Sequence, residues 1–215
     1  MMPCMSDLVI CFDLDDTLYK EIDYLKSAYL EIAETVGHPE AAEQMVEWYK
    51  EGKNAFEELI KAFGLDLTIA DFLKIYRNHY PEISLEEGVM EYLEELKDSG
   101  AKLGVITDGR SVAQRNKIRA LGIESMLDAV IISEEIGSEK PDVRNYQAVM
   151  NMFPDRKVFV YVGDNTKKDF IAPNALGWRT YCVKNDGRNI HSQDYTLPKE
   201  YMPRHVVSSI KDIIL

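Results

Sequence analysis

The chain has 215 residues, of which 46% are hydrophobic, so it can form one substantial domain or one domain that carries a smaller insert. Its net charge of −12 argues against general nucleic-acid binding, because a surface of that sign repels polyanions. No apolar stretch approaches the ~20 residues of a membrane span, and residues 1–7 lack the basic region of a signal peptide, so we expect no membrane association.

An apolar run rich in β-forming residues, 8–12, ends at three carboxylates within four positions, Asp13, Asp15 and Asp16. We predict a strand buried on both faces, as parallel strands of α/β proteins are. Carboxylates at the end of a buried strand are costly unless a cation meets them, and ligands of open α/β sheets bind at the carboxyl ends of the strands. The acids therefore mark a candidate site, while Thr17 is expected to close the loop through a side-chain hydrogen bond.

The next segment, 19–81, is predicted to be mostly helical. Apolar residues between positions 25 and 36 recur with the spacing of a helix that buries one face, and Gly37 is a suitable end for it. Three further short helices are predicted, at 45–49, 56–63 and 69–76. Thr68 is expected to cap the last of them. Four short helices exceed what a connection between two strands needs, so the segment is predicted to be an insert.

The rest of the chain alternates between helices and strands. Helices are predicted at 85–99 and 111–121, and strands at 102–106, 129–133, 157–162, 180–183 and 205–207. This alternation predicts a parallel sheet in a doubly wound α/β fold. The stretch 184–203 is polar and contains proline, so we predict a loop there.

Polar residues follow the predicted strands in chain order: Thr107-Asp108-Gly109, Lys140, Asp164 and Asp169. Gly163, directly before one of these acids, leaves the backbone free to turn. Pro141 suits the first turn of a helix, so we expect it to begin the helix that carries Tyr146.

These motifs, each placed after a predicted strand, occur in the order of the haloacid dehalogenase superfamily, which this chain resembles over nearly its whole length. Most members of that superfamily are phosphatases. The resemblance implies a doubly wound, Rossmann-like α/β core formed by residues 1–18 and 82–215 and a helical cap formed by residues 19–81. It also implies the strand order 5-4-1-2-3, with the strand of the first motif in the centre.

The resemblance also implies catalytic roles. Asp13 would be the nucleophile that accepts the phosphoryl group. Asp15 would protonate the leaving oxygen and then activate water, which requires a raised pKa or a proton brought by the substrate. The phosphoryl group would be bound by side chains or backbone amides of Thr107, Asp108, Gly109 and Lys140.

Magnesium is the implied cofactor. Its ligands would be Asp13, the backbone carbonyl of Asp15, and Asp164, an all-oxygen set that suits Mg²⁺. Asp169 would lie outside the direct ligands and orient the motif lysine or a metal-bound water. Asn165 stands where some relatives carry a second adjacent acid, so the role of Asp169 stays open.

We therefore expect a magnesium-dependent phosphatase that hydrolyses a small phosphate monoester, a nucleotide or sugar phosphate, through an aspartyl-phosphate intermediate. Its partner would be a small phosphorylated metabolite, and it would act as a monomer or a homodimer. Its three cysteines, Cys4, Cys11 and Cys182, argue against a disulfide framework and favour a cytoplasmic location.

Three alternatives remain open. A dehalogenase of the same superfamily needs the nucleophile but not Asp15, because a halide leaves without a proton, so Asp15 argues against it. A phosphomutase would need a cap able to retain a bisphosphate. A non-catalytic phospho-ligand-binding protein would be expected to have lost motif residues, and all of them are present.

The substrate is the least determined feature. The run 107–111, with Gln114 and Lys117, resembles the branch of the superfamily that includes nucleoside monophosphatases and acylneuraminate phosphatases. Five residues of the expected cap could face the leaving group: Tyr19, Tyr24, Lys53, Arg77 and His79.

Overall fold

The computed structural model describes residues 5–215. Its centre is a six-stranded parallel sheet with the strand order β3-β2-β1-β4-β5-β6. The strands are β1 (Leu8–Phe12), β2 (Lys102–Thr107), β3 (Ala129–Ile132), β4 (Val158–Gly163), β5 (Arg179–Val183) and β6 (His205–Val207). The expected order of five strands is confirmed, and β6 extends the sheet beyond β5.

The central strand β1 is buried on both faces, as its apolar run predicts. Val9 pairs with Lys102 of β2 on one side and with Phe159 of β4 on the other. Side chains of a strand alternate between its faces, so β1 contributes to two separate hydrophobic clusters. One cluster contains Leu8, Ile10 and Phe12, and the other contains Val9 and Cys11. All five side chains are fully buried.

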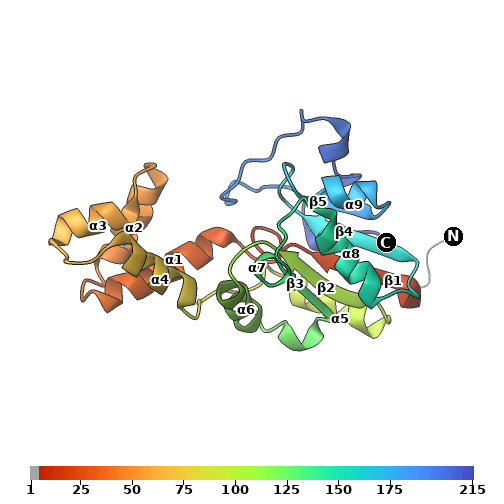
Figure 1. Ribbon diagram of the computed structural model, residues 1–215, viewed down its shortest axis with the longest axis horizontal. Coiled ribbons are helices and arrows are strands. Elements are labelled where there is room, and N and C mark those ends of the chain that lie inside the picture. Colours follow the sequence, from red (N-terminus) through yellow and green to blue (C-terminus); the bar gives the residue numbers. More distant parts are fainter. Residues whose placement is uncertain (1–4) are drawn as a thin grey trace.

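Helices cover both faces of the sheet (Figure 1). One face carries α5 (Val89–Asp98) and α6 (Ser111–Ala120), and the other carries α8 (Val143–Met152) and α9 (Ile171–Ala175). The short α7 (Ser133–Ile136) follows β3 directly. Short 3-10 helices lie at η1 (Met5–Asp7), η2 (Glu124–Met126), η3 (Lys199–Tyr201) and η4 (Ile210–Asp212). The doubly wound α/β fold is thus confirmed.

Two helix starts differ from the expected ones. α5 begins later than residue 85, because Gly88 adopts a left-handed conformation at the N-cap, with φ 75°. Pro141 lies before the start of α8 and not in its first turn. Asp142 is the N-cap of that helix, where its side chain accepts a hydrogen bond from the backbone N–H of Arg144 at 2.9 Å.

Four helices form a lobe at one end of the molecule, beyond the carboxyl ends of the strands (Figure 1). They are α1 (Glu21–Thr35), α2 (Ala41–Lys50), α3 (Ala55–Phe63) and α4 (Ile69–Asn78), and we call them the helical lobe. The lobe has its own hydrophobic cluster, in which Ile32, Met45, Leu59 and Phe72 are fully buried. Thr68 caps α4 through a capping box with Asp71, as predicted.

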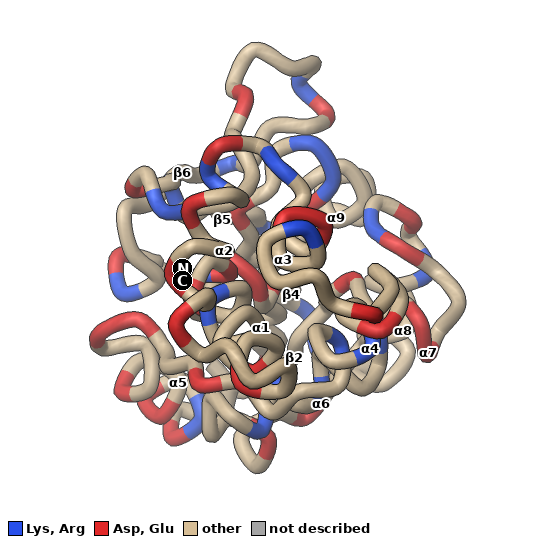
Figure 2. The backbone as a smooth tube through the Cα atoms, turned by 90° about the vertical axis from the view of Figure 1, so that its left-hand side faces the viewer, with Lys and Arg blue, Asp and Glu red and all other residues tan. Residues whose placement is uncertain are grey.

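Acidic residues are spread over the described chain, with lysines and arginines scattered among them (Figure 2). Cys11 and Cys182 are buried and unpaired, and Cys4 lies outside the described residues. Between residues 5 and 215, no helix combines the length and the apolar character that crossing a membrane demands.

Candidate active site

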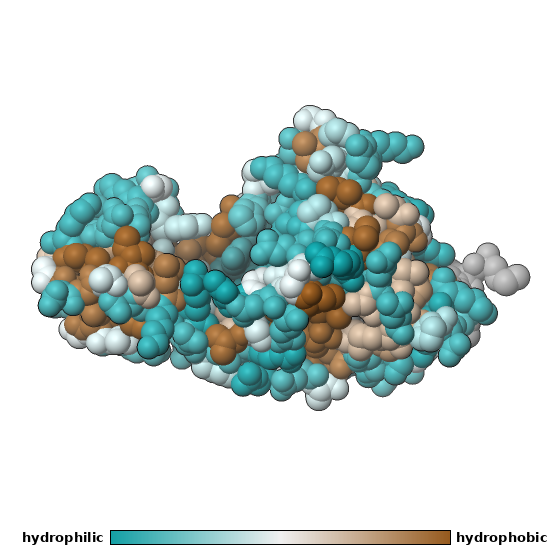
Figure 3. Space-filling model, in the orientation of Figure 1, coloured by the Kyte–Doolittle hydropathy of each residue, from teal (hydrophilic) through white to brown (hydrophobic). Residues whose placement is uncertain are grey.

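Residues of the first, second and fourth motifs line one cavity at the carboxyl ends of β1, β2 and β4, the edge of the sheet nearest the helical lobe (Figure 1). Lys140 and Asp169 lie outside its lining, and Lys140 reaches it through Asp13. The surface is indented between the helical lobe and the core (Figure 3). The cavity has a volume of about 90 Å³, and its lining consists of Asp13, Asp15, Asp16, Glu21, Thr107, Asp108, Asp164, Asn165, Lys168 and His191. Carboxylates make up most of this lining, so an anionic substrate needs cations at close range.

Lys140 joins acids of the first and fourth motifs. Its Nζ lies 2.8 Å from Asp13 Oδ1 and 2.9 Å from Asp169 Oδ1, and it donates to the Tyr161 hydroxyl at 3.0 Å. Burial opposes the charge of this completely buried side chain. The charges of Asp13 and Asp169 outweigh burial, however, and raise the pKa of Lys140 well above its ordinary value. The result is a permanent cation, fixed beside Asp13 and oriented by Asp169.

Asp169 also shapes the turn after β4. Its Oδ2 accepts hydrogen bonds from the backbone N–H groups of Asp164 at 3.1 Å and Asn165 at 2.8 Å. A Cβ atom at Gly163 would lie 2.5 Å from this oxygen, so the close approach requires glycine. The turn brings Asp164 next to Asp13, and one oxygen from each of Asp13, Asp164 and Asp169 lies within 4.8 Å of the others.

Asp108 links the loops of three motifs. Its Oδ1 accepts the backbone N–H of Lys140 at 3.0 Å, and its Oδ2 accepts the Nζ of Lys168 at 2.8 Å. Lys168 lines the cavity and is a second cation beside its carboxylates. The Asp108 carboxylate therefore holds the loops of the three motifs together.

Thr107 and Gly109 differ in how well the structure supports their expected contact with the phosphoryl group. Thr107 lines the cavity, where its hydroxyl accepts a hydrogen bond from Gln114 Nε2. Gly109 lies outside the lining, and its N–H donates to Ser133 Oγ at 2.9 Å. The structure therefore does not bring Gly109 to the site. Glycine suits this position for a different reason. The backbone has a φ of 142°, and a Cβ atom would lie only 3.2 Å from the Gln114 side chain.

Asp15 is held by three side chains. Lys117 Nζ lies 2.6 Å from its Oδ1, Gln114 Nε2 donates to its Oδ2 at 3.0 Å, and the Tyr19 hydroxyl donates to its Oδ1. Burial by itself would raise the pKa of Asp15, but the charge of Lys117 and these hydrogen bonds outweigh burial and lower the pKa below its ordinary value. In this arrangement Asp15 is a carboxylate, the form needed by a general base.

The site carries more negative charge than its lysines offset. Burial raises the pKa of Asp13 to about 6, although Lys140 lowers it. Burial and the charges of Asp169 and Asp13 raise the pKa of Asp164 to about 9. A divalent cation here would relieve this repulsion, and the available donors are carboxylate oxygens, which suit a hard cation. The residues present therefore fit a divalent metal.

The loop after Asp15 closes differently from the prediction. The Thr17 hydroxyl is buried and has no hydrogen-bond partner among residues 5–215, so its expected role is wrong. Asp16 closes the loop instead, in a left-handed conformation with φ 55°. Its carboxylate accepts the backbone N–H groups of Glu21 at 3.0 Å and Ile190 at 2.8 Å.

Three lining residues were not predicted from the sequence: Lys168, Glu21 and His191. Lys168 could have been found, because it directly precedes Asp169 in the fourth motif. Glu21 is the first residue of α1, where burial and the charge of Asp15 raise its pKa to about 8. His191 comes from the loop between β5 and β6. Neither has a sequence signal, because only the folded lobe and loop bring them to the cavity.

Among residues 5–215, the lining of the cavity includes none of the five residues of the expected cap that were predicted to face the leaving group. Tyr19 contacts Asp15, and the ring centroid of Tyr24 lies 4.1 Å from Lys117 Nζ. The structure does not bring the other three to the lining: Lys53, Arg77 and His79.

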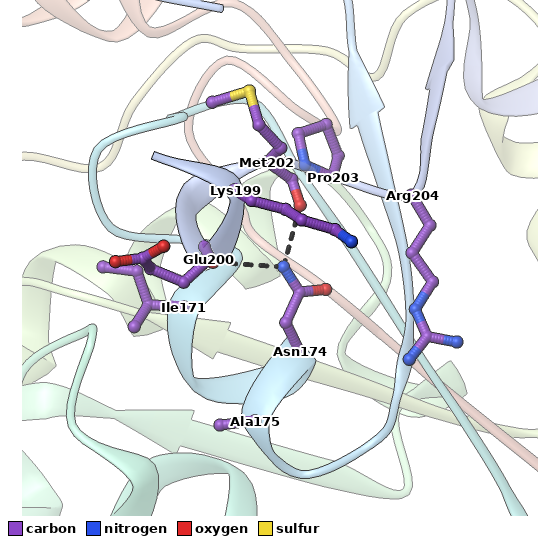
Figure 4. Close-up of a pocket in the computed structure, with 8 residues that line it drawn as sticks. All are labelled: Ile171, Asn174, Ala175, Lys199, Glu200, Met202, Pro203 and Arg204. Atoms are coloured by element: carbon purple, nitrogen blue, oxygen red, sulfur yellow. Dashed lines mark hydrogen bonds between the residues drawn. The ribbon is translucent and has the colours of Figure 1, made fainter. Parts of the chain in front are cut away.

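A wider groove of about 620 Å³ lies away from these acids, beside α9 and η3 (Figure 4). Asn174 lines this groove, and its side-chain amide donates hydrogen bonds to the backbone carbonyls of Glu200 at 3.2 Å and Met202 at 2.8 Å. The Glu200 carboxylate points away from the charged ends of Lys199 and Arg204 (Figure 4). The groove thus lacks the convergent acids and lysines of the first cavity, which we take as the candidate active site.

The chain is similar to known hydrolases. The sequence model of the haloacid dehalogenase-like hydrolase family matches residues 10–183. A glyceraldehyde 3-phosphate phosphatase from Methanocaldococcus jannaschii is 31% identical over 213 residues, covering 87% of this chain and 90% of the relative. The pyrophosphatase PpaX from Halalkalibacterium halodurans is 24% identical over 221 residues, covering 95% and 94% of the two chains.

Solved structures show the same fold. The HAD-hydrolase YfnB from Bacillus subtilis, bound to magnesium, matches with a TM-score of 0.67 and 19% identity over 95% of each chain. An L-2-haloacid dehalogenase matches with a TM-score of 0.63 and 19% identity, covering 95% of this chain and 96% of the other. At these identities the likeness concerns the fold alone.

The doubly wound parallel sheet defines an α/β enzyme, and its candidate active site is the acidic cluster around a buried lysine at the carboxyl ends of the strands. The chain belongs to the haloacid dehalogenase-like hydrolase family, within which it is a phosphatase-type hydrolase.

Proposed function

We propose that this chain is a magnesium-dependent phosphatase that hydrolyses a small phosphate monoester through an aspartyl phosphate on Asp13. The observation that carries the proposal is the buried Lys140 between Asp13 and Asp169, with Asp164 beside them. The lysine keeps Asp13 close to a fixed positive charge, and that charge attracts the anionic group that Asp13 must attack.

In the first step an oxygen of the Asp13 carboxylate attacks phosphorus, and the bond from phosphorus to the leaving oxygen breaks. Asp15 passes a proton to that leaving oxygen. Because Lys117 keeps Asp15 ionised, we infer that the substrate brings this proton, as the monoanion of a phosphate ester with a second pKa near ~6 can. In the second step Asp15 takes a proton from water, which attacks the aspartyl phosphate and releases phosphate and Asp13.

Asp13, Asp164 and the backbone carbonyl of Asp15 would hold Mg²⁺, and Asp169 would orient Lys140 and the turn after β4. When bound, Mg²⁺ offsets the charge of the phosphoryl oxygens and of the surrounding carboxylates. Thr107 and Lys168 line the same cavity and would bind further phosphoryl oxygens. The magnesium-bound state of the related fold in YfnB supports this choice of metal.

The substrate class that we propose is a sugar phosphate or a nucleotide. The relative from Methanocaldococcus jannaschii is a glyceraldehyde 3-phosphate phosphatase, so small phosphorylated sugars come first in the screen. The helical lobe at residues 19–81 would act as a cap over the leaving group, since Glu21 at its start lines the cavity. Asp15 favours a phosphatase over a dehalogenase, because a halide leaves without a proton.

The test is a screen of sugar phosphates, nucleoside monophosphates and nitrophenyl phosphate, with and without Mg²⁺. Asp13→Asn keeps the shape of the side chain but removes the attacking charge, so we expect turnover to fall by at least about three orders of magnitude. Asp7→Asn is the matched control, because Asp7 lies at the other end of β1 and its carboxylate faces Lys157 at 3.8 Å. Wild-type turnover in Asp13→Asn would refute the proposed nucleophile.

A further inference from the structure

The loop between β5 and β6, residues 184–204, folds back to the candidate active site. Two of its side-chain amides reach Asp164: Asn189 Nδ2 donates to Asp164 Oδ2 at 3.0 Å, and Gln193 Nε2 donates to the Asp164 carbonyl at 2.8 Å. The backbone N–H of Ile190 donates to Asp16 Oδ2 at 2.8 Å and ties the loop to the first motif. The loop therefore holds both the side chain and the backbone of Asp164, although it belongs to none of the motifs.

The orientation of the Asn189 amide follows from its second partner. Lys20 Nζ lies 2.9 Å from Asn189 Oδ1, and an ammonium group can only donate hydrogen bonds. The amide oxygen must face Lys20, so the amide N–H groups face Asp164. Lys20 has only 5% of its surface exposed and also pairs with Asp186 of the same loop at 3.3 Å. Turning the amide over would place its N–H groups against this buried cation, which is unfavourable.

This contact occupies one oxygen of the Asp164 carboxylate. Within residues 5–215, Asn189 is the side chain that donates a hydrogen bond to this carboxylate, so it alone restrains the carboxylate from the side of the loop. Asp164 shares with Asp13 and Asp169 the cluster of oxygens that fits a divalent cation. A carboxylate that is already held by a hydrogen bond loses less rotational freedom when it binds a cation.

We propose that Asn189 is a positioning residue of the metal site. It orients the Asp164 carboxylate toward the divalent cation, and Lys20, directly before α1, fixes the orientation of Asn189 in turn. The inference rests on the proposed function in taking Asp164 as a metal ligand. Asn189 acts through Asp164 and contacts neither the metal nor the substrate.

Binding of Mg²⁺ to the whole metal-free chain, measured by isothermal titration calorimetry, tests the inference. Asn189→Ala removes the donor, and we expect the Kd for Mg²⁺ to rise about 10- to 100-fold. Lys20→Met should raise it by a smaller factor, because the amide is then free to turn over. Arg188→Ala is the matched control: Arg188 lies in the same loop and pairs with Glu86 and Asp186, but its side chain contacts neither Asn189 nor Asp164 among the described residues, so the Kd should not change.

Turnover at varied Mg²⁺ gives a second measurement. Asn189→Ala should require more Mg²⁺ but approach the wild-type kcat at saturation, because the lost contact acts on metal affinity. An unchanged Kd in Asn189→Ala, or an equal rise in Arg188→Ala, would overturn the inference. A wild-type chain that hydrolyses phosphate esters without binding Mg²⁺ would instead refute the metal assignment of the proposed function, so the two failures can be told apart.

Discussion

Replacing Lys140 by methionine should strongly destabilise the metal-free chain. The completely buried ammonium lies 2.8 Å from Asp13 and 2.9 Å from Asp169, so its loss leaves two carboxylates facing each other without a cation. Breaking a buried ion pair costs about 3–5 kcal/mol in the free energy of unfolding. For a chain of this size each kcal/mol lowers Tm by about 2–4 °C, so we expect a drop of about 6–20 °C.

Thermal unfolding in the presence of a chelator measures this change. Lys168→Met is the matched control, because the Nζ of Lys168 pairs with the Asp108 carboxylate at 2.8 Å and its side chain is 33% exposed. A pair so open to solvent contributes about 0–1 kcal/mol, so Tm should fall by no more than about 4 °C. Equal drops in the two variants would refute the reasoning.

A double variant separates charge from packing. In Lys140→Met with Asp169→Asn, one of the two unpaired carboxylates is gone, so we expect the combined loss of stability to be smaller than the sum of the single losses. The same lysine also lowers the pKa of Asp13, which burial holds at about 6. Lys140→Met should therefore shift the acidic limb of the pH–rate profile to higher pH. Additive losses and an unshifted profile would contradict an electrostatic role for Lys140.

Three further predictions concern Asp15, the pH dependence of stability, and Gly163. Asp15→Asn cannot supply a proton, so turnover of alkyl phosphates should fall far more than that of nitrophenyl phosphate, whose phenolate leaves unaided; equal losses would remove Asp15 from the acid role. Burial and neighbouring charges raise the pKa values of Asp13 and Asp164 to about 6 and about 9, so the folded metal-free chain binds protons more tightly than the unfolded chain. Its stability should be lost as pH rises through these values, and Mg²⁺ should raise Tm more at about pH 9 than at about pH 5; an equal rise would contradict the assignment. Gly163→Ala places a Cβ 2.5 Å from Asp169 Oδ2, so Tm should fall by several degrees and the Kd for Mg²⁺ should rise, as calorimetry can measure.

Local sequence patterns were enough to predict most of the fold. The apolar run 8–12, the Thr68 cap and the polar residues after each strand report on interactions between residues that are close in the chain, so they are visible without a structure. The helix at α8 shows the limit of such patterns. Pro141 and Asp142 can each begin a helix, and only the folded backbone determines that Asp142 is the cap.

The sequence by itself determined which acids and which lysine follow the strands, because each of them comes soon after an apolar run that predicts its strand. Their order at the edge of the sheet differs from their order along the chain, since the strands are arranged β3-β2-β1-β4-β5-β6. Tertiary structure decided what charges they carry and what holds them. Asp15 meets Lys117 across 102 positions of sequence, and Asn189 meets Lys20 across 169. No spacing pattern in the sequence predicts partners that are so far apart. The sequence likewise did not predict that the N–H of Gly109 would bond to Ser133, or that the Thr17 hydroxyl would have no partner among the described residues. The pKa of a buried carboxylate depends on these partners, so it follows from the fold and not from the motif.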